Sequence, residues 1–102
     1  MFGRRKSNSG LELPPIATTD QRAVEILRVW AVPGAPQQLT MRTCWRDPGA
    51  WGLLLADVAR HAAQAYQREG QNPDDVLGRI RQMFDAEWVS PTSAAENLSD
   101  KN

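Results

Sequence analysis

The hydrophobic pattern begins with two runs rich in β-branched and aromatic residues, AVEILRVWAV (23–32) and QQLTMRTCW (37–45). The segment between them, VPGAPQ, contains two prolines and one glycine, which favour a turn and exclude a continuous helix. The pattern therefore predicts a β-hairpin with a loop at residues 33–36. Residue 32 then faces residue 37, and the expected core face contains the pairs Trp30–Leu39, Arg28–Met41, Ile26–Thr43 and Val24–Trp45.

The opposite face of this hairpin is also partly apolar. Leu27, Val29 and Ala31 alternate along the first strand, and they are too apolar a set for ordinary solvent exposure. A shift of one residue in the pairing would exchange the two faces. In the register above, we expect these three residues to lie in an interface with another subunit.

The pattern changes to a helical period between Trp45 and Gly70. Asp47 is a typical cap, Pro48 suits the first turn, and Gly70 is a typical stop. Apolar residues recur at steps of three and four, which predicts a helix with one face that must pack on something. This stripe consists of Trp51, Leu54, Leu55, Val58, Ala62, Ala65 and Tyr66.

A second helix is predicted from Asn72 to about Trp88. Pro73 occupies its first position, and Asp74 and Asp75 follow where the helix dipole favours negative charge. The connection after Gly70 is short, so the two helices are expected to be antiparallel neighbours. The apolar stripe of this helix consists of Val76, Leu77, Ile80, Met83, Phe84 and Trp88.

Together these elements predict an α+β fold of order ββαα, in which a β-hairpin is followed by two antiparallel helices. An isolated hairpin has two bare edges, and pairing two hairpins across a two-fold axis would complete a larger sheet. We therefore expect a homodimer. The length of 102 residues allows one domain, placed at residues 20–92, between a flexible arm at 1–19 and a disordered tail at 93–102.

Charge and cysteine content narrow the classes of partner. Twelve Lys and Arg balance twelve Asp and Glu, which disfavours nucleic acid and anionic membranes as partners. The single Cys44 fits a reducing compartment. Because we find neither the apolar run of a signal peptide nor a membrane span, we expect a cytoplasmic protein without membrane contact.

The candidate chemistry is sparse. Asp57 and His61 are four residues apart on the first helix, but no nucleophile elbow and no third metal ligand accompany them. Cys44 is most simply a small strand residue that packs. The sequence thus predicts no catalytic residue, no metal site and no cofactor.

Three strings, EILRVWAVPG, CWRDPGAWGLLLADVARHAAQAYQREG and FDAEWVSPT, resemble those of a family of proteobacterial proteins of about 100 residues that is classed as a domain of unknown function. The resemblance covers about residues 20–92. It implies a bacterial cytoplasmic protein, and it supplies no catalytic residue, cofactor or substrate.

Three functional hypotheses remain open. The first is a non-enzymatic homodimeric interaction module whose protein partner is unknown. The second is a small-molecule-binding protein or minor enzyme with a pocket at the dimer interface, since pockets favour interfaces. Its ligand-binding residues would be Arg28, Trp51, His61 and Tyr66. The third is a weak nucleic-acid-binding module, which requires Arg28, Arg42 and Arg46 to emerge on one exposed surface.

Overall fold

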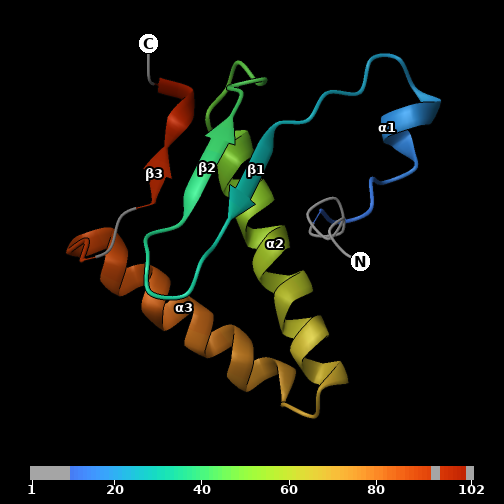
Figure 1. Cartoon of the computed structure of the whole chain (residues 1–102). Coiled ribbons are helices and arrows are strands. Elements are labelled where there is room, and N and C mark those ends of the chain that lie inside the picture. Colours follow the sequence, from blue (N-terminus) through green and yellow to red (C-terminus); the bar gives the residue numbers. More distant parts are fainter. Residues whose placement is uncertain (1–9, 93–94, 101–102) are drawn as a thin grey trace, which may run out of the picture.

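The computed structural model describes residues 10–92 and 95–100 of the chain. A one-turn helix, α1 (Ile16–Thr19), precedes the hairpin strands β1 (Leu27–Trp30) and β2 (Gln38–Met41). The helices α2 (Gly49–Arg68) and α3 (Pro73–Val89) follow. A short strand, β3 (Glu96–Asn97), and a 3₁₀ turn, η2 (Leu98–Asp100), come last (Figure 1). The predicted α+β class, a hairpin followed by two packed helices, is confirmed.

The ends of the two long helices follow from local sequence. α2 begins at Gly49, one residue later than predicted, although the Asp47 carboxylate still accepts a hydrogen bond of 2.8 Å from the Gly49 backbone nitrogen. Gly70 ends the turn after α2 with a φ of +97°, a conformation that glycine adopts without steric cost. At the start of α3, the Asn72 side chain accepts a hydrogen bond of 3.0 Å from the Asp75 nitrogen, which confirms the predicted cap.

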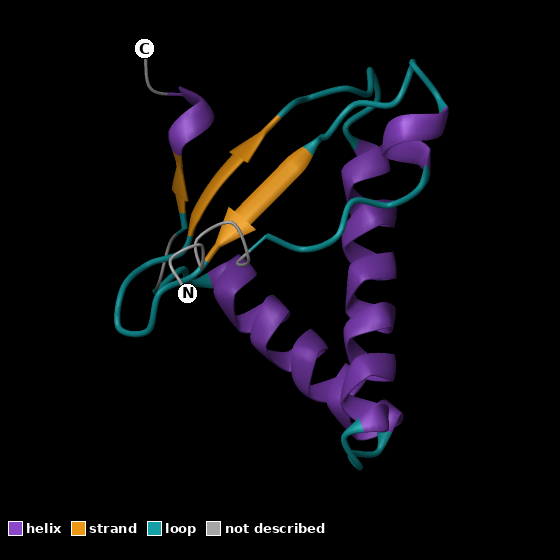
Figure 2. Ribbon diagram, turned by 45° about the vertical axis from the view of Figure 1, so that its right-hand side comes forward, coloured by secondary structure: helices purple, strands orange, loops and turns teal. Residues whose placement is uncertain are grey.

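The two helices meet near the turn that joins them and diverge from there, so that they form a V (Figure 2). Close to this vertex, Ala63 of α2 and Val76 of α3 are 4% and 9% exposed, and they form the buried core of the described residues. The sheet lies across the open end of the V. Figure 1 views it from the face that no helix covers, because α2 passes behind β1 and β2.

The register of the hairpin differs by one residue from the predicted one. The observed partners are Leu27–Met41, Arg28–Thr40, Val29–Leu39 and Trp30–Gln38. The cause lies in the loop, which spans residues 31–37 rather than 33–36 and is centred on Gly34. Gly34 has a φ of +82°, and a hydrogen bond of 3.1 Å joins the Ala35 nitrogen to the Val32 oxygen. The predicted loop is centred on the peptide bond between Gly34 and Ala35, whereas the observed loop is centred on Gly34 itself. This difference moves the partner of each β1 residue by one position along β2.

This shift exchanges the faces of β1, and the prediction for that strand was wrong. Leu27 and Val29 now share a face with Leu39 and Met41, whereas Trp30 and Arg28 lie on the opposite face. Most exposures agree with the new assignment, because Leu27, Leu39 and Met41 are half-buried and Trp30 is 49% exposed, although Val29 is 51% exposed. Trp30 is therefore not a core residue of this chain.

The sheet also has a third strand, in the segment for which the sequence predicts a tail. β3 pairs in parallel with β2 through Gln38–Glu96 and Leu39–Asn97, giving the order β1-β2-β3. The Ser99 hydroxyl oxygen accepts a hydrogen bond of 2.6 Å from the Met41 nitrogen, and Asn97 Nδ2 lies 3.4 Å from Met41 Sδ. The C-terminal segment thus covers part of the β2 edge. Residues 93–94 and 101–102 of the predicted tail, and 1–9 of the predicted arm, lie outside the described residues.

Candidate functional site

A pocket of about 270 Å³ opens beside the hairpin. It is lined by Glu25, Ile26, Arg28, Thr40, Arg42 and Ser99, among others. The register explains why these residues meet. Arg28 lies opposite Thr40, and a hydrogen bond of 2.9 Å from the Arg42 nitrogen to the Ile26 oxygen continues the ladder, so Ile26, Arg28, Thr40 and Arg42 share the uncovered face of the hairpin.

The charged side chains of this pocket are linked through Glu25. Arg28 Nη2 and Nε lie 2.9 and 3.3 Å from the Glu25 carboxylate oxygens and form a bidentate ion pair. Arg42 Nε donates a hydrogen bond of 3.0 Å to the Glu25 backbone oxygen. These contacts hold both guanidinium groups near the same residue. Two cations and one anion leave the lining with one net positive charge.

Several hydrogen-bond donors of the pocket are free within the described residues. The Arg42 contact uses Nε, so its two Nη groups have no partner there, and the Thr40 hydroxyl has none. The Ser99 hydroxyl accepts the bond from Met41, which leaves its own hydrogen available. Donors of this kind around a net positive charge are suited to an oxyanion.

The four predicted ligand-binding residues are not brought together within one chain. Arg28 lines the pocket on the sheet, whereas Trp51, His61 and Tyr66 are distributed along α2. Trp51 and Tyr66 are 15 positions apart on α2, which corresponds to ~22 Å along its axis at a rise of about 1.5 Å per residue. Trp51 instead packs edge-to-face on Trp45, with ring centroids 5.6 Å apart. The predicted interface pocket remains a hypothesis about two chains.

The other candidate residues also lie apart from one another. Asp57 forms its ion pair with Arg60, at 3.9 Å, and not with His61, which is four residues further along α2. Cys44 is exposed, so the expectation that it packs as a strand residue was wrong, because β2 ends at Met41. Within residues 10–92 and 95–100, no group of three His, Cys, Asp or Glu side chains could hold a metal ion.

The predicted interface residues Leu27, Val29 and Ala31 have different positions in the fold. Leu27 and Val29 lie on the face that they share with Leu39, whereas Ala31 is exposed in the loop after β1. They are therefore not three members of one strand face directed away from the core, as the predicted register required. Val29 is nevertheless 51% exposed, so this face is not fully covered by the chain itself.

Ser99 is the pocket residue that sequence reasoning missed. Its segment contains no periodic apolar pattern, and a strand as short as Glu96–Asn97 is below the length at which alternation can be recognised. The position of Thr40 opposite Arg28 depends on the corrected register. Sequence reasoning therefore identified Arg28 and Arg42 as candidates, but it did not predict that both contact Glu25 beside one pocket.

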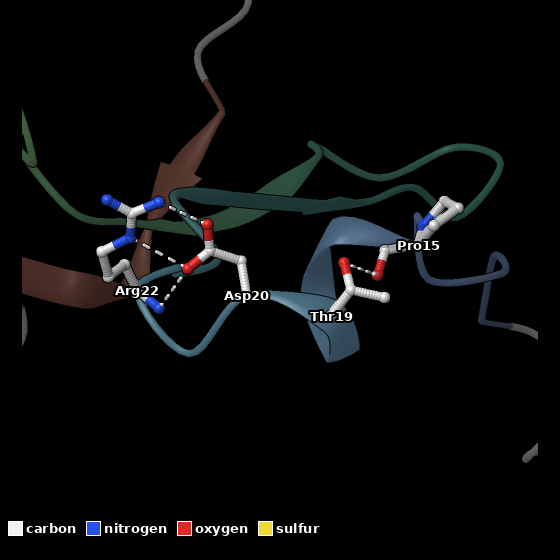
Figure 3. Close-up of polar contacts among 4 residues, drawn as sticks. All are labelled: Pro15, Thr19, Asp20 and Arg22. Carbon is white, nitrogen blue, oxygen red and sulfur yellow. Dashed lines mark hydrogen bonds and ion pairs between the residues drawn. The ribbon is translucent and has the colours of Figure 1, made fainter.

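A second polar cluster follows α1 (Figure 3). The Asp20 carboxylate accepts hydrogen bonds from the Arg22 backbone nitrogen, Nε and Nη2 at 2.9, 3.0 and 2.8 Å. The Arg22 guanidinium lowers the pKa of Asp20 below its ordinary value, and the carboxylate raises the pKa of Arg22. Both partners come from one short segment, so this pair orders the approach to β1 and does not form a pocket.

None of the helices in the described part of the chain is long and apolar enough to cross a membrane. No curated protein matches the sequence. One similar solved structure is that of a candidate pyruvate dehydrogenase from the photosynthetic bacterium Rhodopseudomonas palustrus CGA009. It shares 41% identity, covers 83% of this chain and 88% of that chain, and superposes with a TM-score of 0.69.

The family comparison agrees with the resemblance found in the sequence. The matching family is described as a domain of unknown function, and its profile matches residues 10–92. This range includes α1, both hairpin strands and both long helices, and it ends before β3. The chain thus belongs to the domain of unknown function family DUF5076.

Proposed function

We propose that this protein is a non-enzymatic interaction module that acts as a homodimer. The observation that carries the proposal is the apolar surface of the diverging helices. Val76 is buried at the vertex, but the same α3 stripe continues through Met83 and Phe84 to Trp88, which is 75% exposed. A stripe that is buried at one end and bare at the other needs a further surface to cover it.

The opposite side of α3 supports this interpretation. Arg79 Nη1 donates to Gln82 at 2.8 Å, and Arg81 pairs with Asp85 at 3.0 Å. The charged side chains on the polar side of α3 are therefore paired within the helix itself. The apolar side chains of the exposed half of the stripe have no such cover from the same chain. Phe84 and Trp88 stack on each other with centroids 5.5 Å apart, which gives the bare half of the stripe one continuous aromatic surface.

The chain exposes more surface than a compact monomer of its mass. The chain exposes 8875 Å², whereas a folded monomer of 11.4 kDa is expected to expose roughly 5,800 Å². The extended segment before β1 accounts for part of this excess. On the diverging arms of the V, Trp88 of α3 is 75% exposed and Val58 of α2 is 51% exposed.

A second copy is the occupant that we favour. The inner side of the V and the exposed half of the α3 stripe are both apolar. In a two-fold dimer, the exposed half of α3 from each chain would pack into the V of the other chain. α2 contributes Leu55 and Val58 of its apolar stripe, which are 42% and 51% exposed. The net charge of zero also imposes no repulsion between two copies.

The relative from Rhodopseudomonas raises dehydrogenase activity as an alternative, and we assign none to this chain. Oxidation of pyruvate depends on a cofactor that takes up electrons. The sequence has no glycine-rich phosphate-binding turn. Among the described residues, no three His, Cys, Asp or Glu side chains lie close enough together to hold a metal ion. These residues do not fit such a cofactor, so we derive no catalytic step.

Sedimentation equilibrium at several micromolar concentrations tests the dimer. We expect a mass of about twice 11.4 kDa for the unmodified chain. Trp88→Glu should shift it toward monomer, because the new carboxylate would be desolvated in the interface. Arg81→Gln, on the polar side of α3, is the matched control and should leave the mass unchanged.

A second measurement keeps the test decisive if Trp88→Glu does not fold. Cys44 is the single cysteine and is exposed, so it accepts a spin label without any substitution. In a dimer, the labelled unmodified chain should give one defined distance between two labels by pulsed electron paramagnetic resonance. A folded chain that is monomeric at micromolar concentration, with no such distance, would overturn the proposal.

A further inference from the structure

We propose that the pocket beside the hairpin binds a small monocarboxylate through Arg42, Thr40 and Ser99. This inference goes beyond the proposed dimer and does not depend on it, because the pocket is lined by residues of the hairpin and by Ser99, whereas the bare apolar stripes lie on the helices. Its basis is the juxtaposition of two guanidinium groups, two hydroxyls and one carboxylate around one opening.

The charge of the lining selects a monoanion. Arg28 is engaged by both of its contacts to Glu25, at 2.9 and 3.3 Å, so its charge is largely compensated. Arg42 contacts Glu25 through the backbone oxygen and not through the carboxylate, which leaves its own charge uncompensated. One free positive charge matches the single charge of a carboxylate better than the higher charge of a phosphate at neutral pH.

The geometry of the donors favours the same class. The free edge of the Arg42 guanidinium presents two parallel N–H groups, the arrangement that binds the two oxygens of a carboxylate. Thr40 is a neighbour on the same strand face, and its hydroxyl has no partner among the described residues. Ser99 is fixed by the bond of 2.6 Å from Met41, and this orients its hydroxyl beside β2.

The remaining lining limits the size and polarity of the ligand. A volume of about 270 Å³ is near the lower end of the range for small-molecule sites, so it suits a short ligand. Ile26 shares the face of Arg42 and is half-buried, so it provides an apolar contact next to the charged groups. A carboxylate with a short aliphatic chain satisfies both features.

Butyrate is a suitable probe, and two-dimensional NMR of the ¹⁵N-labelled full chain is the readout. Titration at constant ionic strength should give saturable shifts of the Thr40, Arg42 and Ser99 amides, with a Kd on the order of 1 to 10 mM for an open site of this kind. Inorganic phosphate is titrated in parallel, and it should bind more weakly than butyrate because only one positive charge is free.

Three variants locate the site. Arg42→Gln and Thr40→Val should each weaken butyrate by about fivefold or more, and Thr40→Val keeps the β-branched shape so that the strand is retained. Glu25→Gln removes the negative charge of the lining and should tighten butyrate rather than weaken it. Arg46→Gln is the matched control, because Arg46 is exposed after β2 and does not line the pocket.

The proposal is overturned by any of four results. Butyrate gives no saturable shift; phosphate binds as tightly as butyrate; Arg46→Gln weakens binding as much as Arg42→Gln; or a short single-stranded oligonucleotide shifts the same amides at much lower concentration. The last result would assign the face of Arg28, Arg42 and exposed Trp30 to nucleic acid instead. Since sedimentation reports the oligomeric state separately, failure of this site and failure of the dimer are distinguishable.

Discussion

The vertex of the V and its open end are built from the same two helices, yet they have opposite environments. At the vertex, Ala63 and Val76 are buried and the turn through Gly70 is fixed by backbone hydrogen bonds. About two and three turns further along α3, Phe84 and Trp88 continue the apolar stripe with much of their surface in water. The sequence pattern is uniform along α3, so the difference arises from the divergence of α2.

This contrast separates what the chain stabilises by itself from what it offers to something else. Burial of a large apolar side chain contributes ~1.5 to 3 kcal/mol relative to exposure, and in the described residues few such side chains obtain that contribution in full. The vertex is therefore expected to dominate the stability of a single chain. The open end is expected to contribute mainly when a second chain covers it.

The largest effect is expected at the vertex. Val76→Asp would place an unpaired carboxylate at a buried position of the vertex, and it should lower the free energy of unfolding by ~3 to 5 kcal/mol or prevent folding. Val32→Asp is the matched control, because Val32 lies in the exposed hairpin loop, and its effect should stay within about 0.5 kcal/mol. Urea denaturation followed by circular dichroism measures both. Equal losses in the two variants would contradict the vertex as the main source of stability.

The next effect distinguishes the two faces of the sheet. Leu39→Ala removes a half-buried side chain and should cost ~1 to 2 kcal/mol, below the range of about 2 to 5 kcal/mol for fully buried leucine. Trp30→Ala should cost less, because Trp30 is on the exposed face. The register predicted from sequence places both residues in the core, so it requires the tryptophan substitution to cost more. The order of the two denaturation midpoints therefore decides between the registers.

The helices and the fold class were accessible from sequence because their signals are local. The Asn72 cap, Pro73 and the spacing of the α3 stripe act within one or two turns, and the structure has the helix at Pro73–Val89. The hairpin was also predicted correctly as an element. In each case, the residues that determine the structure are close together in the chain.

The register and the third strand could not be obtained in this way. The register depends on whether the loop is centred on Gly34 or on the bond beside it, and both choices satisfy the proline and glycine pattern of residues 32–37. β3 depends on a parallel pairing with Gln38 and Leu39, more than fifty residues away. The pocket requires both features, because Ser99 comes with β3 and the pairing of Arg28 with Thr40 comes with the register.

A smaller effect is expected at the loop that sets the register. Gly34 has a φ of +82°, so Gly34→Ala should destabilise the chain by about 1 kcal/mol through backbone strain. Gly78→Ala is the comparison, because Gly78 lies inside α3 and an added Cβ would meet nothing within 4 Å. That substitution should stabilise by ~0.5 to 1 kcal/mol, since alanine is the better helix former. Changes of the same sign in both variants would contradict the role assigned to Gly34.

The smallest effect is expected in the segment between α1 and β1, which lies outside the vertex and outside the two long helices. The pKa of Asp20 lies below its ordinary value of 3.8, because the ionised carboxylate accepts three hydrogen bonds from Arg22. For a lowered carboxyl pKa, the stabilisation is complete above the ordinary value and is lost as the pH falls through the lowered one. A ¹³C NMR titration of the Asp20 carboxyl should therefore give a midpoint below the ordinary value, and Arg22→Gln should raise it.

Both groups are exposed, so added salt should also raise the midpoint in the unmodified chain. If Arg22→Gln left the midpoint where it was, the contacts after α1 would not form in solution, and the chain before β1 would have no fixed approach to the sheet.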